Sequence, residues 1–173
     1  MTTLTRLKNQ LLARGATRFP ALAKMFTDSY TPRTSDGRIP WVPPAVPLAQ
    51  AKLALITTAG IHHRHQTPFD MGDSDGDPSC RELNTATLFD DFVITHDYYN
   101  HSDADKDPNI ILPLDRLKEL VDEKVLGSIA ATHYSFMGHI DGPHIDTLIN
   151  RTAMEITHKL RAEKVDIALL TPG

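Results

Sequence analysis

The chain has 173 residues, of which 40% are hydrophobic and 23% charged, and its formal net charge is −4. These values are typical of one globular domain, with or without an additional arm. The slight acidity and the lack of a basic run argue against a nucleic-acid partner. No apolar stretch approaches the roughly 20 residues that span a bilayer, so we expect no membrane contact.

Two further features bear on location. The leucines near the N-terminus alternate with charged and polar residues, a pattern unlike the apolar core of a signal peptide. The single cysteine, Cys80, cannot form an internal disulfide, which indicates a reducing compartment. We therefore expect a cytoplasmic protein.

The first part of the chain is predicted to be a helical arm followed by a linker. Amphipathic spacing of apolar residues predicts helices over 3–13, ended by Gly15, and over 19–30. Residues 31–47 contain five prolines and predict an irregular linker, in which Trp41 packs on the core. We expect residues 1–47 to form this arm and linker, and residues 48–173 to form an α/β domain.

Apolar runs and helical stripes alternate in the second part. Strands are predicted over 53–58, 92–96, 128–136 and 165–170, helices over 116–124 and 143–163, a long polar loop over 62–88, and a short extended piece over 109–112. The last helix is expected to turn Ile149 and Met154 inward. This alternation predicts a mostly parallel, Rossmann-like sheet flanked by helices.

Polar clusters follow the predicted strands, where ligands bind in open α/β sheets. His62, His63 and His65 follow the first strand, and His96–Asp97 ends the second. His133 and Gly138 lie near the end of the third. We expect these strand ends to bring the three segments around one crevice. Histidines there can act as acids and bases or bind a metal.

Several unusual sequence motifs occur in order along the chain, including Thr-Thr-Ala-Gly-Ile-His, Gln-Thr-Pro-Phe-Asp-Met, Asp-Pro-Ser-Cys-Arg-Glu, Thr-His-Asp-Tyr-Tyr-Asn-His-Ser-Asp-Ala and Ser-Phe-Met-Gly. In these motifs the chain resembles the selenoprotein B family of the glycine, sarcosine, betaine and D-proline reductases. The resemblance covers about residues 52–173, and residues 1–45 add little to it.

The resemblance implies reductive cleavage of a C–N bond in an amino acid or an N-methylated amine. In that family a selenolate or thiolate attacks the α-carbon and displaces the amine, a dithiol serves as reductant, and a partner subunit, often pyruvoyl-bearing, helps to hold the substrate. The selenocysteine or cysteine follows a strand similar to 169–173. We therefore expect this chain to be the front part of a longer protein and to be inactive alone.

Site residues are expected on the same basis. A leaving amine needs a proton, for which His62, His96 and then His133 are the acid–base candidates. The substrate carboxylate needs a cation, for which Arg64 or Arg81 is available. Further substrate contacts are expected from Asp97, Tyr98 and Gly138.

Two alternatives remain open. A metal-dependent enzyme could use a divalent cation held by His96, His101 and Asp103, together with His62. A non-catalytic subunit could bind partners through the proline-rich linker. An exposed apolar edge after the last strand would favour self-association, so we expect a homo-oligomer.

Overall fold

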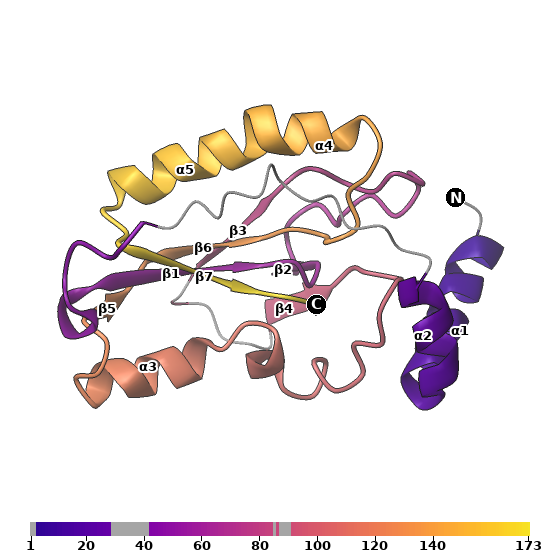
Figure 1. Ribbon diagram of the computed structural model, residues 1–173, viewed down its shortest axis with the longest axis horizontal. Coiled ribbons are helices and arrows are strands. Elements are labelled where there is room, and N and C mark those ends of the chain that lie inside the picture. Colours follow the sequence, from indigo (N-terminus) through magenta and orange to yellow (C-terminus); the bar gives the residue numbers. More distant parts are fainter. Residues whose placement is uncertain (1–2, 29–41, 85, 87–90) are drawn as a thin grey trace.

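The computed structural model describes residues 3–28, 42–84, 86 and 91–173. A mostly parallel sheet lies between two helical layers, α5 (Ala153–Ala162) on one face and α3 (Leu114–Asp122) on the other (Figure 1). The predicted α/β class, with a Rossmann-like sheet and an N-terminal helical arm, is confirmed. No helix within the described ranges is long and apolar enough to cross a membrane.

Strand β1 (Lys52–Thr57) is the central strand of the sheet. β7 (Ile167–Thr171) pairs parallel with one edge of β1. β5 (Ser128–Ile129) and β6 (Thr132–Ser135) both pair parallel with the other edge of β1. β3 (Arg81–Asn84) pairs antiparallel with the outer side of β6. Neighbours on both edges and helices on both faces explain why the predicted strand over 53–58 is an almost unbroken apolar run.

The register along one edge of β1 changes between its two partners. Lys52 lies opposite Ser128, an offset of 76, whereas Ile56 lies opposite Tyr134, an offset of 78. Two extra residues in the partner strand therefore bulge away from β1 between these pairs. The prediction of a single strand over 128–136 is therefore wrong, because the bulge divides this segment into β5 and β6.

The side chain of His133 fills the gap that this bulge creates. Its Nδ1 accepts the backbone N–H of Leu55 at 3.0 Å, so the ring replaces a carbonyl of the interrupted ladder. His133 is fully buried, and burial lowers its pKa to about 4. It is therefore neutral at pH 7 and lies inside the sheet rather than at a strand end.

Short strands were missed in the polar part of the sequence. The predicted loop over 62–88 includes most of β2 (Ile61–His63) and all of β3. β2 pairs antiparallel with β4 (Phe92–Ile94) in a separate two-stranded sheet, so the strand predicted over 92–96 is shorter and does not join the main sheet. Strands of three or four residues with polar side chains give too little alternation to be recognised.

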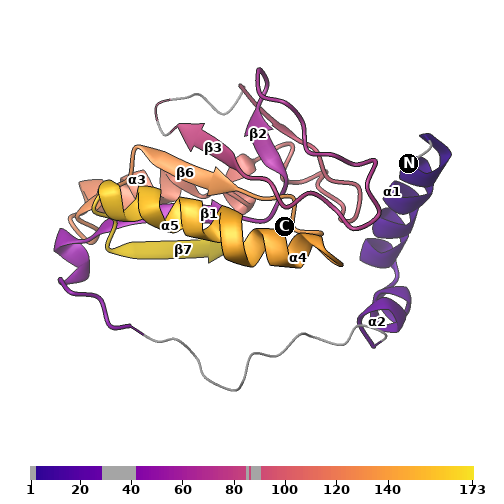
Figure 2. The same cartoon turned by 90° about the horizontal axis from the view of Figure 1, so that it is seen from above.

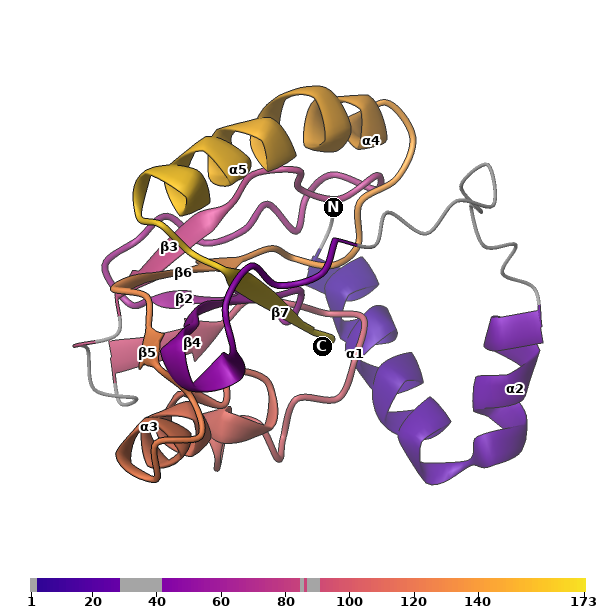
Figure 3. The same ribbon diagram turned by 60° about the vertical axis from the view of Figure 1, so that its left-hand side comes forward.

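The arm consists of two packed helices, α1 (Thr3–Arg18) and α2 (Pro20–Asp28), beside the sheet (Figure 3). The prediction that Gly15 ends the first helix is wrong, because Gly15 lies within α1. The apolar stripe faces solvent in part, since Leu4 and Leu11 are 76% and 59% exposed. Trp41 and residues 31–40 of the predicted linker lie outside the described residues, and the division at residue 47 stays a prediction.

The last helix is continuous but irregular. α4 (His144–Thr147) leads through a π-helical segment (Leu148–Thr152) into α5. Its contacts with the sheet use every fourth residue, Leu148, Thr152, Ile156 and Leu160. Ile149 and Met154 are consequently exposed, and their predicted inward position is wrong. Within the described ranges, 3-10 turns span Leu48–Gln50 and Pro108–Ile110, the second in place of the extended piece predicted over 109–112.

The hydrogen bond from Leu55 to the His133 ring leads to a stability prediction. His133→Leu should destabilise the chain by about 1 to 3 kcal/mol in urea unfolding at pH 7, because it leaves the buried Leu55 N–H without an acceptor. His133→Asn should cost clearly less, because its side-chain oxygen can accept the same N–H. His158→Asn on the exposed side of α5 is the control and should change little. Equal losses for the two His133 variants would contradict this role.

The same histidine should make stability depend on pH. Its pKa of about 4 in the folded chain lies below the value of about 6.5 expected when unfolded. The unfolded chain therefore takes up the proton first, and up to about 3 kcal/mol of stability is lost as the pH falls from 6.5 towards 4. Unfolding measured at pH 7 and pH 5 should show a smaller pH effect in His133→Asn than in the unmodified chain.

Candidate functional site

The carboxyl ends of β1, β6 and β7 meet at one edge of the sheet, on the side where α1 lies (Figures 1 and 2). Backbone hydrogen bonds continue past the strands and connect the following segments. The Thr58 N–H donates to the Thr171 carbonyl at 3.0 Å, and the Gly60 N–H donates to the Phe136 carbonyl at 2.8 Å. The Gly173 N–H reaches Thr58 Oγ1 at 3.3 Å. We use the name strand-end crevice for this region, in which the backbones of the three segments pack closely together.

Two glycines allow the backbones to approach closely in the crevice. Gly60 and Gly138 have φ angles of +68° and +87°, which residues with a Cβ atom rarely adopt. A Cβ on Gly138 would lie 2.4 Å from the Thr58 carbonyl oxygen and 3.3 Å from His96 Nε2. Gly138, Thr58 and His96 are therefore immediate neighbours. The segments that contain His96 and Gly138 meet at this place.

His96 follows β4 and turns one ring nitrogen towards this meeting point. Its Nδ1 accepts the Tyr98 N–H at 3.1 Å, so the proton of the neutral ring is on Nε2. The side chain is buried, and burial lowers its pKa to about 4, with His139 and His101 acting in the same direction. At pH 7 His96 is consequently neutral. It can donate a hydrogen bond from Nε2–H, but it is not an imidazolium that could give up a proton.

Asp97, the next residue, is 2% exposed and is bound by the N-terminal arm. Arg6 Nε donates to Oδ2 at 2.6 Å, and Gln10 Nε2 donates to Oδ1 at 2.8 Å. Burial alone would raise the pKa of Asp97, but the hydrogen bonds from Arg6 and Gln10 outweigh it and lower the pKa. A buried carboxylate of the domain thus depends on side chains of α1 for its charge partner.

The two tyrosines that follow form the wall of the crevice beside His96. The Tyr99 ring lies edge-on to the imidazole with 4.7 Å between centroids, and its hydroxyl donates to the Ala59 carbonyl at 3.0 Å. The Tyr98 ring packs against the His139 ring, with 4.4 Å between their centroids. Burial raises the pKa of both hydroxyls, so both are protonated at pH 7. They can donate hydrogen bonds but carry no charge.

His62 lies one layer behind the crevice, in β2. Its Nδ1 donates to the His63 carbonyl at 2.8 Å, and its Nε2 accepts the Thr95 hydroxyl at 2.9 Å. Both ring nitrogens are therefore in use, and the ring is 1% exposed. Burial lowers its pKa, so His62 is neutral and reaches the surface only through Thr95.

The two arginines expected to bind a carboxylate are not in the crevice. Arg81 donates to the carbonyls of Thr67 and Pro68 and to the Ser79 hydroxyl, and its guanidinium lies 4.3 Å from the centroid of the Phe69 ring. It holds the loop between β2 and β3 together. Arg64 lines a different cavity, with Phe92 and the segment 104–109.

The predicted metal ligands do not converge. His101 is paired with Asp105 at 2.8 Å, and Asp103 is paired with Lys106 at 2.8 Å. Within the part of the chain that the structure describes, no three His, Cys, Asp or Glu side chains are close enough together to hold a metal ion. The hypothesis of a metal site at His96, His101 and Asp103 therefore has no geometric support.

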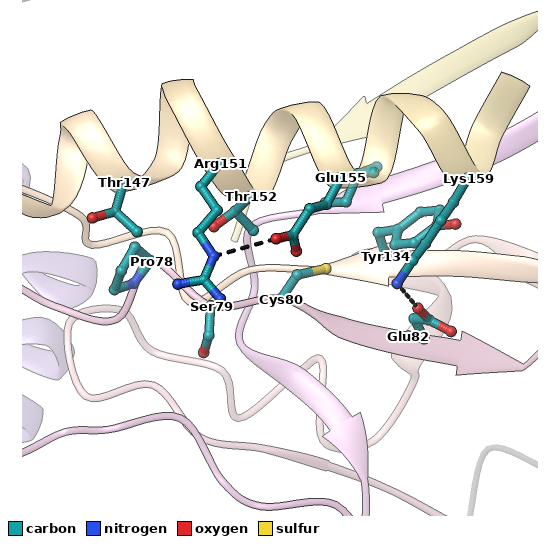
Figure 4. A pocket seen from close by; sticks show the side chains of 11 residues that line it. Pro78, Ser79, Cys80, Glu82, Tyr134, Thr147, Arg151, Thr152, Glu155 and Lys159 are labelled. Atoms are coloured by element: carbon teal, nitrogen blue, oxygen red, sulfur yellow. Dashed lines mark hydrogen bonds and ion pairs between the residues drawn. The ribbon is translucent and has the colours of Figure 1, made fainter.

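A separate cleft of about 390 Å³ lies between the last helix and the strands β3 and β6 (Figure 4). Its charged residues are paired with one another, Arg151 with Glu155 and Lys159 with Glu82. Cys80 is in this cleft, and burial raises the pKa of its thiol to about 12. Cys80 is therefore protonated at pH 7, and a thiol is a weak nucleophile until it is deprotonated.

The crevice therefore contains His96, Asp97, Tyr98 and Gly138 of the expected residues, with His62 behind it. Sequence reasoning missed Thr58, Thr95 and the arm residue Arg6. Thr58 is the last residue of a predicted strand, which is a usable signal. Nothing in the local sequence pattern indicates that Arg6 contacts a residue 91 positions away.

Comparisons with known proteins agree with the resemblance. The family model for glycine/sarcosine/betaine reductase selenoprotein B matches residues 22–173. D-proline reductase subunit gamma of Acetoanaerobium sticklandii is 31% identical over 133 residues, which are 77% of this chain and 53% of that protein. Glycine reductase complex component B subunit gamma of Symbiobacterium thermophilum is 27% identical over 159 residues, 84% of this chain and 34% of that protein.

A third relative, sarcosine reductase complex component B subunit beta of Peptoclostridium acidaminophilum, is 29% identical over 114 residues, 58% of this chain and 24% of that protein. The chain thus spans about half or less of the length of these relatives. No solved structure shows a significant match. The match over residues 22–173 includes every strand and the whole crevice except the arm, and on it the chain belongs to the glycine/sarcosine/betaine reductase selenoprotein B family.

Proposed function

We propose that this chain is the front part of a reductase subunit that cleaves the C–N bond of an amino acid or an N-methylated amine. Family membership and relatives named as D-proline, glycine and sarcosine reductase components support this reaction class. The strand-end crevice supports it too, because it combines a buried neutral imidazole with close-packed backbone at the usual ligand site of such sheets.

The nucleophile is proposed to be a selenocysteine or cysteine located just beyond Gly173 in the longer protein. The observation that carries this proposal is the position of Gly173. Its N–H contacts Thr58 Oγ1 at 3.3 Å, while the carbonyl of Thr58 packs against Gly138, next to His96 Nε2. A residue that follows Gly173 would therefore enter the crevice on the side that His96 faces.

The proposed reaction is a displacement at the α-carbon. The selenolate or thiolate forms a bond to this carbon, the C–N bond breaks, and the amine leaves with the electron pair. A substrate that enters as an ammonium ion releases a neutral amine without further proton transfer. The dithiol reductant is then oxidised to a disulfide and supplies two electrons, the bond from the α-carbon to selenium or sulfur breaks, and this carbon takes up a proton while the selenolate or thiolate is regenerated.

His96 is proposed to orient the reacting groups through its Nε2–H. Its pKa of about 4 makes the imidazolium form rare at pH 7, so hydrogen-bond donation suits it better than proton transfer. Tyr98 and Gly138 are proposed to contact the substrate beside it. His62 acts at most through Thr95, and His133 has a structural role in the sheet.

The active form is proposed to be a complex with a partner reductase subunit, which could carry a pyruvoyl group. Leu170 on β7 is 69% exposed, and Leu4 and Leu11 on α1 are exposed as well. Such apolar surfaces are typical of subunit contacts, and they also support self-association.

The role of His96 can be tested in the assembled full-length reductase. His96→Asn keeps an acceptor for the Tyr98 N–H but removes the Nε2–H, so kcat should fall about 10²-fold. His158→Asn, on the outer side of α5, should leave kcat unchanged. A loss in His96→Asn of less than threefold would show that the imidazole does not take part.

The position of the nucleophile can be tested in the gene and in the native protein. The codons directly after Gly173 should include TGA or a cysteine codon, followed by an open reading frame. Elemental analysis of the native subunit should then find one selenium per chain, or alkylation should label one cysteine there. Any other stop codon at this place would contradict the proposal.

A further inference from the structure

A cavity of about 420 Å³ lies between α1 and the loop that follows β2, next to the strand-end crevice. It is lined by Arg6, Pro68, Phe69, Asp70, Met71, Gly72 and Thr95. The volume is in the range of small-molecule sites. Phe69 and Met71 give it a buried apolar wall, and three polar side chains stand around it.

Arg6 has hydrogen-bonding capacity left for a ligand in this cavity. A guanidinium has five N–H donors, and Asp97 takes two of them, from Nε and from one terminal nitrogen. Among the residues that the structure describes, no other group pairs with Arg6. Its side chain is 46% exposed, so the remaining N–H groups are accessible. A guanidinium binds carboxylates through pairs of such donors.

Asp70 supplies the opposite charge at the same cavity. One of its oxygens accepts the Gly72 N–H at 2.6 Å, and the other has no partner within the described ranges. Thr95 adds a hydroxyl oxygen, which donates its hydrogen to His62 and can still accept a hydrogen bond. The cavity thus offers donors for a carboxylate and acceptors for an ammonium group.

We infer that this cavity binds a small zwitterionic amino acid, with its carboxylate on Arg6 and its ammonium group near Asp70 and Thr95. The inference rests on the proposed function and identifies a substrate-binding residue for it. Arg6 lies outside the family match over residues 22–173. The arm of this chain therefore contributes the group that binds the carboxylate, while Asp70 and Thr95 come from the matched region.

The inference can be tested by calorimetric titration of the 173-residue chain with glycine and with D-proline, which need no turnover. Arg6→Gln should raise the dissociation constant at least tenfold, because it removes a charge-assisted pair of hydrogen bonds. Arg14→Gln removes the same charge elsewhere on α1 and should change it less than twofold. Asp70→Asn should weaken the amino acid and methylamine, but not acetate.

A second variant separates ligand binding from docking of the arm. Gln10→Ala removes a contact between α1 and Asp97 but does not line the cavity, so binding should stay within twofold. Thermal unfolding without ligand confirms that each variant is folded. Equal affinities for Arg6→Gln and Arg14→Gln, an equal loss in Gln10→Ala, or no binding of either amino acid would each overturn the inference.

The outcome is independent of the test of the reductase itself. If the assembled complex reduces its substrate and Arg6→Gln leaves KM unchanged, the inference is wrong and the proposed function stands. If the titrations show the expected pattern but the complex reduces neither amino acid, the binding site is real and the proposed function fails.

Discussion

Hydrogen bonding along both edges of β1 is the constraint on which the rest of the structure depends. β7 pairs with all but the first residue of the strand, while β5 and β6 pair with its two ends on the opposite edge. The Leu55 N–H between these ends would be buried without a partner, and the His133 ring accepts it. The strand ends meet at the crevice because β7 keeps one register along β1, and the His133 ring satisfies the N–H at the point where the register changes on the opposite edge.

The buried carboxylate of Asp97 imposes a second constraint. A charge that is 2% exposed is costly unless it is paired, and its partners come from α1. The arm is therefore held against the domain by a specific polar contact, while much of its leucine stripe remains exposed. This combination places the arm within the site and leaves an apolar surface for further contacts.

Three histidines with similar sequence contexts have different physical roles. His133 completes a backbone ladder, His62 is bonded through both nitrogens, and His96 has an Nε2–H directed to the crevice. All three have lowered pKa values because they are buried. Their functions are therefore separated by the contacts of their ring nitrogens, a property that sequence position does not reveal.

We could predict from the sequence the α/β class, the central and last strands, the helices on each face and the family, because long apolar periodicities and ordered motifs are local properties. Only the folded chain shows that 128–136 divides into two strands, that Arg81 binds its own loop, and that Arg6 reaches Asp97. Each of these depends on a partner outside the local sequence, 13 residues away for Arg81 and Pro68, 78 for His133 and Leu55, and 91 for Arg6 and Asp97. Hydrogen-bond partners of that kind are set by packing and register, which no local pattern encodes.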